Sequence, residues 1–317
     1  MAKSVDEVRG DMPCLKDLVY LDSASVVPAP LPVIKAMEAY LYSHPFNYGV
    51  GVWKRSVEAA ERVNEARRIA AQAVGAAADA EIAFTKNTTE AINLVAQGLD
   101  WKPGDEIILT ELEHQSNTIP WMRAAQEHGG KVRFVPADSD GWVDPDDVRR
   151  AMTPATRLVA CTHVSNVFGT IQPVREITRI AREHGALAFV DAAQSAGRIP
   201  VRVSEIGYDA ILARIRELTA RMIEILRATP KVIFHGSARL DRQAGIVMWS
   251  VEGMEPDRVA RELDRIGNVA VASGAQGSLL AIKPKGVTSI LRTSVHYCNT
   301  REDLDALAAA LRQLVAR

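Results

Sequence analysis

The chain has 317 residues, enough for one large domain and a smaller one. Its composition, 47% hydrophobic and 24% charged, is typical of a globular protein, and a formal net charge of -1 excludes a general attraction to nucleic acid or to an anionic membrane surface. The longest apolar runs are strand-sized and fall short of the roughly 20 residues that span a bilayer. The N-terminal stretch is charged and lacks an apolar signal core, so we expect a cytoplasmic protein.

The first 75 residues are predicted to form a separate N-terminal arm. Residues 31–43 and 57–75 have helical patterns and are joined by a loop at 44–53. Three cysteines, Cys14, Cys161 and Cys298, are too widely spaced for a disulfide framework or a metal site. We expect each to pack as a small apolar residue, and we predict no metal.

A large domain is predicted over residues 76–212. Short apolar runs alternate there with amphipathic stretches, which predicts a mainly parallel, doubly wound α/β sheet. Gly129 and Gly185 stand where two of the helices should end. The expected strands are 81–85, 106–110, 132–136, 157–164 and 187–193, and the expected helices are 89–99, 119–129 and 174–185.

After Tyr208 the pattern changes, and residues 213–317 are predicted to form a smaller α/β C-terminal domain. It opens with a long amphipathic helix at 213–230. The rest contains strand-like runs beginning at Lys231, Ala244, Asn268 and Thr288, and helices at 256–267 and near 301–315.

Ligands of open parallel sheets bind beyond the carboxyl ends of the strands, so the residues at those ends are candidate site residues. Thr88 and Thr89 stand where a helix begins. The free N–H groups and positive dipole of a helix start, with two hydroxyls added, would suit a phosphate group. A plain helix cap that includes Glu90 is the alternative.

Three further strand ends carry polar side chains. His114 is either a solvated histidine or an imidazole that stacks on a ligand or moves a proton. Asn166 is either a turn residue or an amide directed into the crevice. Asp191 ends an apolar strand, where a carboxylate needs a partner, either a backbone N–H or a protonated ring nitrogen. Gln194 should face the same crevice.

Six segments, in this order, resemble the signature segments of the cysteine desulfurase branch of the class V aminotransferases. The resemblance implies a fold-type-I pyridoxal 5'-phosphate (PLP) enzyme, usually a homodimer, that acts on a small amino acid. For a desulfurase it also implies a sulfur-acceptor protein. The segments are YLDSAS (20–25), NTTEAINLVAQG (87–98), ELEHQSNTIPW (111–121), THVSNVFGT (162–170), VDAAQSAGRIPV (190–201) and RTSVHYCNTREDL (292–304).

The resemblance also implies roles for individual residues. Thr88 and Thr89 match the phosphate-binding threonines, and His114 matches the histidine stacked on the pyridine ring. Asp191 and Gln194 match the neighbours of the ring nitrogen and the ring hydroxyl. Asn166 and Arg292 match the groups that hold the substrate carboxylate, for which an arginine fork is chemically suited.

The chain departs from the family pattern at two places. No lysine lies between Lys131 and Lys231, and the segment that bears the Schiff-base lysine in the family, on the order of 80–90 residues, is absent at about Ile211–Arg214. Such a loss should leave apolar sheet edges exposed. The position of the desulfurase cysteine falls on Gly277, and the arginine position before it falls on Ala272.

We therefore expect a PLP-dependent enzyme of the cysteine desulfurase type that takes sulfur from L-cysteine. A cysteine-independent class V aminotransferase or lyase is one alternative, and a catalytically dead protein that binds PLP or a partner is another. The absent segment has three explanations: residues missing from the sequence, a deletion, or a pseudoenzyme.

Overall fold

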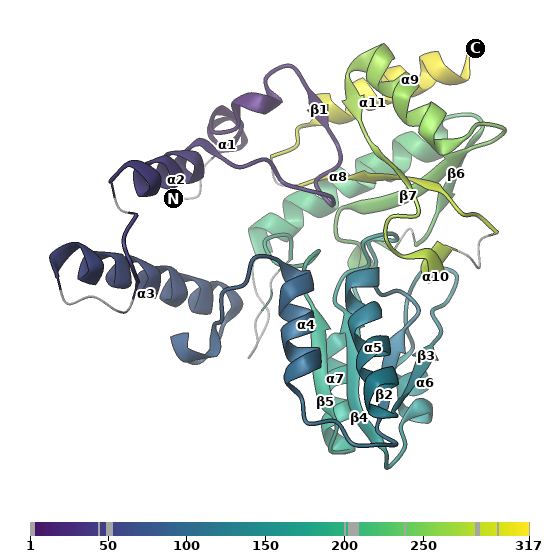
Figure 1. The fold of residues 1–317 in the computed structure, drawn as a ribbon. Coiled ribbons are helices and arrows are strands. Elements are labelled where there is room, and N and C mark those ends of the chain that lie inside the picture. The colour runs from purple at the N-terminus through teal and green to yellow at the C-terminus, as the bar shows by residue number, and fades with distance from the viewer. Residues whose placement is uncertain are drawn as a thin grey trace.

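The computed structural model describes residues 4–43, 45–48, 53–199, 201, 209–237, 239–282, 286–296 and 298–316. Side chains are not described for residues 209–214 and 279. The N-terminal half of the predicted junction at 206–211 therefore lies outside the described residues. Figure 1 shows the two α/β bodies and an N-terminal segment that runs alongside them.

The large domain is built on a parallel sheet of four strands in the order β3-β2-β4-β5. All four strands were expected from their apolar runs, because a strand covered on both faces needs few polar residues. Their bounds are β2 Glu106–Thr110, β3 Lys131–Val135, β4 Thr156–Thr162 and β5 Leu187–Asp191.

Helices cover both faces of this sheet, so the doubly wound fold is confirmed (Figure 1). Alternate residues of β2 point to opposite sides: Ile107 packs with Trp121 of α5, whereas Ile108 packs with Ile177 of α7. Gly129, in the left-handed conformation at φ 70°, ends α5 as expected. The helices are α4 Thr88–Gly98, α5 Ile119–His128, α6 Pro145–Ala151 and α7 Val174–Glu183, with a short 3-10 turn, η3 Gln115–Asn117.

The strand predicted at 81–85 is absent, and that prediction was wrong. A 3-10 turn, η2 Asp79–Glu81, occupies its start, and residues 82–85 are an extended segment without a strand partner among the described residues. Phe84 is 54% exposed and has the guanidinium of Arg67 over its ring at 5.7 Å. An apolar run forms a strand only where a neighbouring strand accepts its N–H and C=O groups.

The C-terminal domain has an antiparallel sheet in the order β6-β7-β10-β9, with α8, α9 and α11 packed around it. One strand was predicted for 268–274, and the structure divides it: β8 pairs with the N-terminal strand β1 and β9 pairs with β10. The bounds are α8 Asp209–Ala228, β6 Val232–His235, η4 Leu240–Arg242, β7 Ile246–Val251, α9 Pro256–Gly267, β8 Val269–Ala270, β9 Ala272–Gly274, α10 Leu279–Ile282, β10 Ile290–Ser294 and α11 Arg301–Val315.

Residues 4–20 lie beside this C-terminal sheet. β1 runs parallel to β8, and Arg9 forms an ion pair with Asp303 of α11 at 2.9 Å. In contrast, α2 and α3 project from the body (Figure 1), and α2 has no buried residue. The N-terminal elements are α1 Val5–Gly10, η1 Pro13–Leu15, β1 Val19–Tyr20, α2 Leu31–Ser43 and α3 Lys54–Val74.

Candidate active site

The N-terminus of α4 presents two threonines, as the sequence predicts. Asn87 is the N-cap, and its side chain accepts a hydrogen bond from the backbone N–H of Glu90 at 2.9 Å. The cap therefore does not use the hydroxyls of Thr88 and Thr89, and both residues are exposed. The first-turn N–H groups and the helix dipole make this end suited to an anion.

His114 lies close to this helix start through Ser116. The hydroxyl of Thr89 donates to Ser116 Oγ at 2.9 Å, and Ser116 Oγ lies 3.1 Å from His114 Nδ1. The backbone N–H of Ser116 also donates to His114 Nδ1 at 3.1 Å. Nδ1 is thus an acceptor, so a neutral ring carries its proton on Nε2. Partial burial lowers the pKa of His114, which favours this neutral form.

Asp191 ends β5 as a buried carboxylate. Its Oδ1 accepts a hydrogen bond from the backbone N–H of Ala193 at 2.9 Å. Burial raises the pKa of Asp191, and the nearby His114 opposes that rise. Asp191 therefore has the backbone N–H partner that the sequence offered as one possibility, but this partner occupies only one of the two carboxylate oxygens. The other remains available for a cationic group, which would stabilise the ionised carboxylate.

Asn166 and Arg292 come together, but other parts of the chain engage both. Asn166 Nδ2 donates to the carbonyl of Gln276 at 2.6 Å, and Ser278 Oγ donates to Asn166 Oδ1 at 2.9 Å. Arg292 is buried, and its Nη1 donates to the carbonyl of Asn166 at 3.1 Å. The side-chain amide of Asn166 is therefore already bonded on both of its polar atoms.

The Arg292 guanidinium is shared between the N-terminal segment and the crevice. Its Nη2 donates to Asp22 Oδ1 at 2.9 Å and to Ser25 Oγ at 2.7 Å. Its Nε is buried and has no hydrogen-bond partner among the described residues. A buried donor left without a partner is costly, so this nitrogen is the part of the arginine that fits an added carboxylate.

Gly277, the position aligned with the family's cysteine, lies against His114. A Cβ atom built on Gly277 would overlap the Nε2 side of the imidazole and lie 2.5 Å from Cδ2. The backbone of Gly277 has φ +69°, which side-chain-bearing residues rarely adopt, and its carbonyl accepts a hydrogen bond from Gln115 N at 2.8 Å. In this conformation a cysteine does not fit at residue 277.

Three other residues considered in the sequence analysis, Gln194, Cys298 and Lys231, make contacts that give them no role in the candidate site. Gln194 Nε2 donates to the carbonyl of Ala24 at 2.7 Å, so its amide faces the N-terminal segment. Cys298 is buried among Met12 and Leu15, which agrees with the packing interpretation. Lys231 is exposed at the start of the C-terminal sheet.

Sequence reasoning missed three contributors to this region. Glu113, next to His114 in the sequence, was given no role, but it is buried. Asp22 and Ser25, the partners of Arg292, belong to the YLDSAS segment, which was noted only for its resemblance. An arginine predicted to be buried signals that an acidic partner is needed, but its position in the sequence gives no sign of which one.

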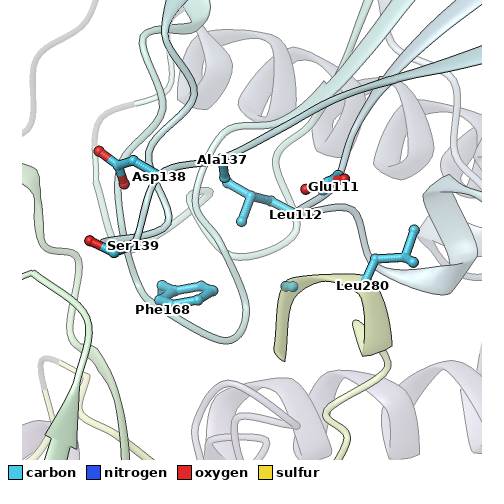
Figure 2. Close-up of a pocket in the computed structure, with 8 residues that line it drawn as sticks. Glu111, Leu112, Ala137, Asp138, Ser139, Phe168 and Leu280 are labelled. Carbon is cyan, nitrogen blue, oxygen red and sulfur yellow. The ribbon is translucent and has the colours of Figure 1, made fainter. Parts of the chain in front are cut away.

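A cavity of roughly 260 Å³ lies beside this region (Figure 2). Its wall combines the segment after β2 with Phe168 and Leu280, and none of the predicted site residues lines it. The residues are Glu111, Leu112, Ala137, Asp138, Ser139, Phe168, Leu280 and Ala281. Among the described residues, no group of three or more His, Cys, Asp or Glu side chains is placed to hold a metal ion. No helix in the described part of the chain has the length and apolarity to cross a membrane.

The model of the family "Aminotransferase class-V" matches residues 19–213 and 203–307, so the chain belongs to that family. A probable cysteine desulfurase of Methanothermobacter thermautotrophicus is 33% identical, with 98% of each chain covered. The solved apo cysteine desulfurase of Thermococcus onnurineus superposes with a TM-score of 0.93 at 28% identity, covering 100% of this chain and 99% of that one. A C-DES mutant solved with glycine covalently linked to its PLP cofactor shares the fold, with a TM-score of 0.81 at 20% identity, covering 96% of this chain and 98% of that one.

The Methanothermobacter alignment extends over 392 positions, whereas this chain has 317 residues, a difference of 75. At least that number of positions in the relative has no counterpart here. The family match is itself divided, and its two parts meet at residues 203–213. This is the part of the chain where the sequence indicates an absent segment.

The residues present fit PLP, the cofactor of this family. The phosphate would lie at a helix N-terminus with two exposed threonines, the ring would lie against an imidazole whose pKa burial lowers, and the ring nitrogen would face a buried carboxylate with one oxygen available. The orphaned Nε of Arg292 fits the carboxylate of an amino acid.

Proposed function

We propose that this chain is a PLP-binding protein of the cysteine desulfurase type whose substrate is L-cysteine. One observation carries the proposal: an exposed helix start with two threonines, a partly buried histidine and a buried aspartate lie at one edge of a parallel sheet, and the buried Arg292 of β10 contacts this edge through the carbonyl of Asn166. This edge is where open α/β sheets bind ligands.

Each residue has one task in the proposal. Thr88, Thr89 and the first turn of α4 hold the phosphate, and His114 lies against the ring. Asp191 keeps the ring nitrogen protonated. Bound PLP supplies an electron sink for negative charge at the substrate Cα, and a charged ring nitrogen strengthens that sink. Arg292 Nε fixes the substrate carboxylate, and Asn166 positions Arg292 through its backbone carbonyl.

A second candidate function is binding without turnover. It is favoured by the absence of any lysine between Lys131 and Lys231 and by the contact between Gly277 and His114, which leaves no place for a sulfur-accepting thiol. The same glycine also suits a cysteine-independent aminotransferase or lyase. The divided family match and the 75-position difference support the view that the family's lysine segment belongs at residues 203–213.

The proposal includes the homodimeric state, a sulfur-acceptor protein and the cytoplasmic location expected from the sequence. The exposed apolar side chains of the projecting helix α2 support the dimer, because an isolated helix with no buried residue gains stability only from a partner. They include Met37, Tyr40, Leu41 and Tyr42.

The test is to measure the mass of the purified protein and its absorbance with PLP. We expect PLP to bind to a chain of 34.5 kDa, with Asp191→Asn as the control that loses binding. Borohydride should leave no covalent adduct, because no lysine is in place. An adduct on a 34.5 kDa chain would overturn the candidate function of binding without turnover. A larger mass would show that the purified protein contains the segment that the sequence lacks. Failure of the wild-type protein to bind PLP would overturn the proposal itself.

A further inference from the structure

Glu113 has a fully buried carboxyl group that accepts three hydrogen bonds. Thr110 Oγ1 and Asn117 Nδ2 donate to it, each at 2.5 Å, and the backbone N–H of Thr162 donates at 2.8 Å. The donors come from three places: the end of β2, the turn η3 and the end of β4. One carboxyl group therefore joins the end of β2 and the turn η3, which are neighbours in the sequence, to the end of β4, where Thr162 lies 49 positions from Glu113.

Two of these segments hold the candidate site residues. Glu113 is adjacent to His114, which caps η3, and Thr162 is the register partner of Asp191 in the pairing of β4 with β5. Asn117 is itself fixed, because Trp121 Nε1 donates to Asn117 Oδ1 at 2.8 Å inside the core. The carboxyl group thus connects the turn that carries His114 to the strand pair that carries Asp191.

We propose that Glu113 is a positioning residue that sets the distance between His114 and Asp191. The inference rests on the proposed function for its purpose, since these two residues would enclose the pyridine ring. Its geometry stands without the cofactor. Among the described residues, no other side-chain hydrogen bond joins the turn that carries His114 to the end of β4.

Replacing Glu113 by glutamine changes its hydrogen bonds without changing the charge of the side chain. The titratable groups that face it are Cys161 of β4 and Asp191 of β5, and burial raises the pKa of Glu113 to about 8. The carboxyl group is therefore neutral over the range in which His114 titrates. Glu113→Gln keeps the size of the side chain and its neutral charge in this pH range. The amide N–H₂ of glutamine cannot accept a hydrogen bond, so the N–H donor of Asn117 or of Thr162 loses its acceptor.

The experiment compares wild-type protein with Glu113→Gln and with the matched control Glu111→Gln. The pKa of His114 is measured in the cofactor-free protein by NMR. Burial lowers the pKa of His114, Asp191 raises it and Arg292 lowers it. We expect Glu113→Gln to lower that pKa by about 0.5 unit or more as the imidazole moves away from Asp191, and Glu111→Gln to leave it unchanged.

The dissociation constant of PLP is measured on the same proteins. Glu113→Gln should raise the dissociation constant of PLP at least about tenfold, as expected when a buried donor loses its acceptor. Thr110→Val removes one of the three hydrogen bonds, should act in the same direction, and replaces Glu113→Gln if that variant does not fold.

Two results have separate meanings. A variant with a lower melting temperature but an unchanged His114 pKa and unchanged PLP affinity would overturn the positioning role and leave only a structural one. Wild-type protein that binds no PLP would overturn the proposed function, while the His114 titration would still decide whether Glu113 positions that ring.

Discussion

Gly277 and His114 lie in direct contact, because the space that a Cβ atom on Gly277 would need is filled by the imidazole. The glycine thus lets the segment after β9 approach the histidine. The same segment bonds both polar atoms of the Asn166 side chain, through Gln276 and Ser278. The aligned cysteine position is therefore part of how the chain holds its own candidate site.

Gly277→Ala tests this contact. The positive φ should cost about 1–2 kcal/mol in the free energy of unfolding, and overlap with His114 should add about 1–3 kcal/mol. Gly253→Ala is the matched control, because Gly253 has φ +72° and open space around its Cβ position. Chemical denaturation measures both. Equal losses in the two variants would show that the His114 contact contributes nothing.

Thr89→Val should weaken PLP binding about tenfold or more and affect the binding of unphosphorylated pyridoxal less, because the lost hydroxyl faces the phosphate directly and reaches His114 only through Ser116. Thr178→Val, at a half-buried threonine of α7 away from the candidate site, is the control. Fluorescence titration with the two ligands makes the comparison. A loss that is the same for both ligands would contradict the assignment of the phosphate to the start of α4.

Arg292→Gln should lower the free energy of unfolding by about 3–5 kcal/mol, since it leaves Asp22 without its partner. The side chains of this pair are only 4% and 22% exposed. The Arg301–Glu217 pair is 72% and 42% exposed, so Arg301→Gln should cost about 1 kcal/mol or less. Urea unfolding of both variants checks the difference, and similar costs would refute it.

Stability should be highest near pH 6.5. Burial lowers the pKa of His163 and His296 to about 4, so the folded state binds fewer protons between pH 4 and 6.5 and stability rises there with pH. Burial raises the pKa of Glu113 to about 8 from 4.5, so the folded state binds more protons up to pH 8 and stability falls as pH rises from 6.5 to 8.

Glu113→Gln should flatten the upper side of this profile, while Glu111→Gln should keep it. Melting temperatures at intervals from pH 4 to pH 8 provide the measurement. A decline above pH 6.5 that persists in Glu113→Gln would assign it to another group.

The outer edge of β5 should drive self-association. Among the described strands, β5 pairs only with β4, and Leu187 on it is 41% exposed. An open apolar edge accepts strands from other molecules. Leu187→Lys should therefore reduce concentration-dependent association in light scattering, whereas Leu240→Lys, at a similarly exposed leucine in η4, should not. Equal behaviour of the two variants would exclude the edge as the cause.

The apolar runs of β2, β4 and β5 predicted their strands correctly, because a strand buried on both faces consists of consecutive apolar residues. Residues 81–85 have the same kind of run, yet they form no strand, since strand formation depends on a neighbour that the run itself does not specify. The division of 268–274 into β8 and β9 has the same origin, as the two halves pair with different strands.

The candidate site was predicted to a similar extent. Thr89, His114 and Asp191 were predicted from polar groups at strand ends, and Arg292 from the family resemblance, and these assignments remain predictions. Glu113 was missed, because its burial depends on a contact with the end of β4, where the backbone N–H of Thr162, 49 positions away, donates to it. The bonds of Asn166 to Gln276 and Ser278 were missed for the same reason: they connect residues more than 100 positions apart.

The pairing of β1 with β8 has a consequence for synthesis on the ribosome. Val19 pairs with Val269, so about 250 further residues must be synthesised after β1 before its partner strand β8 is available. The sheet of β2 to β5 is complete in sequence long before that. The central domain can therefore fold while the chain is still growing, and the N-terminal segment is docked only as the last domain forms.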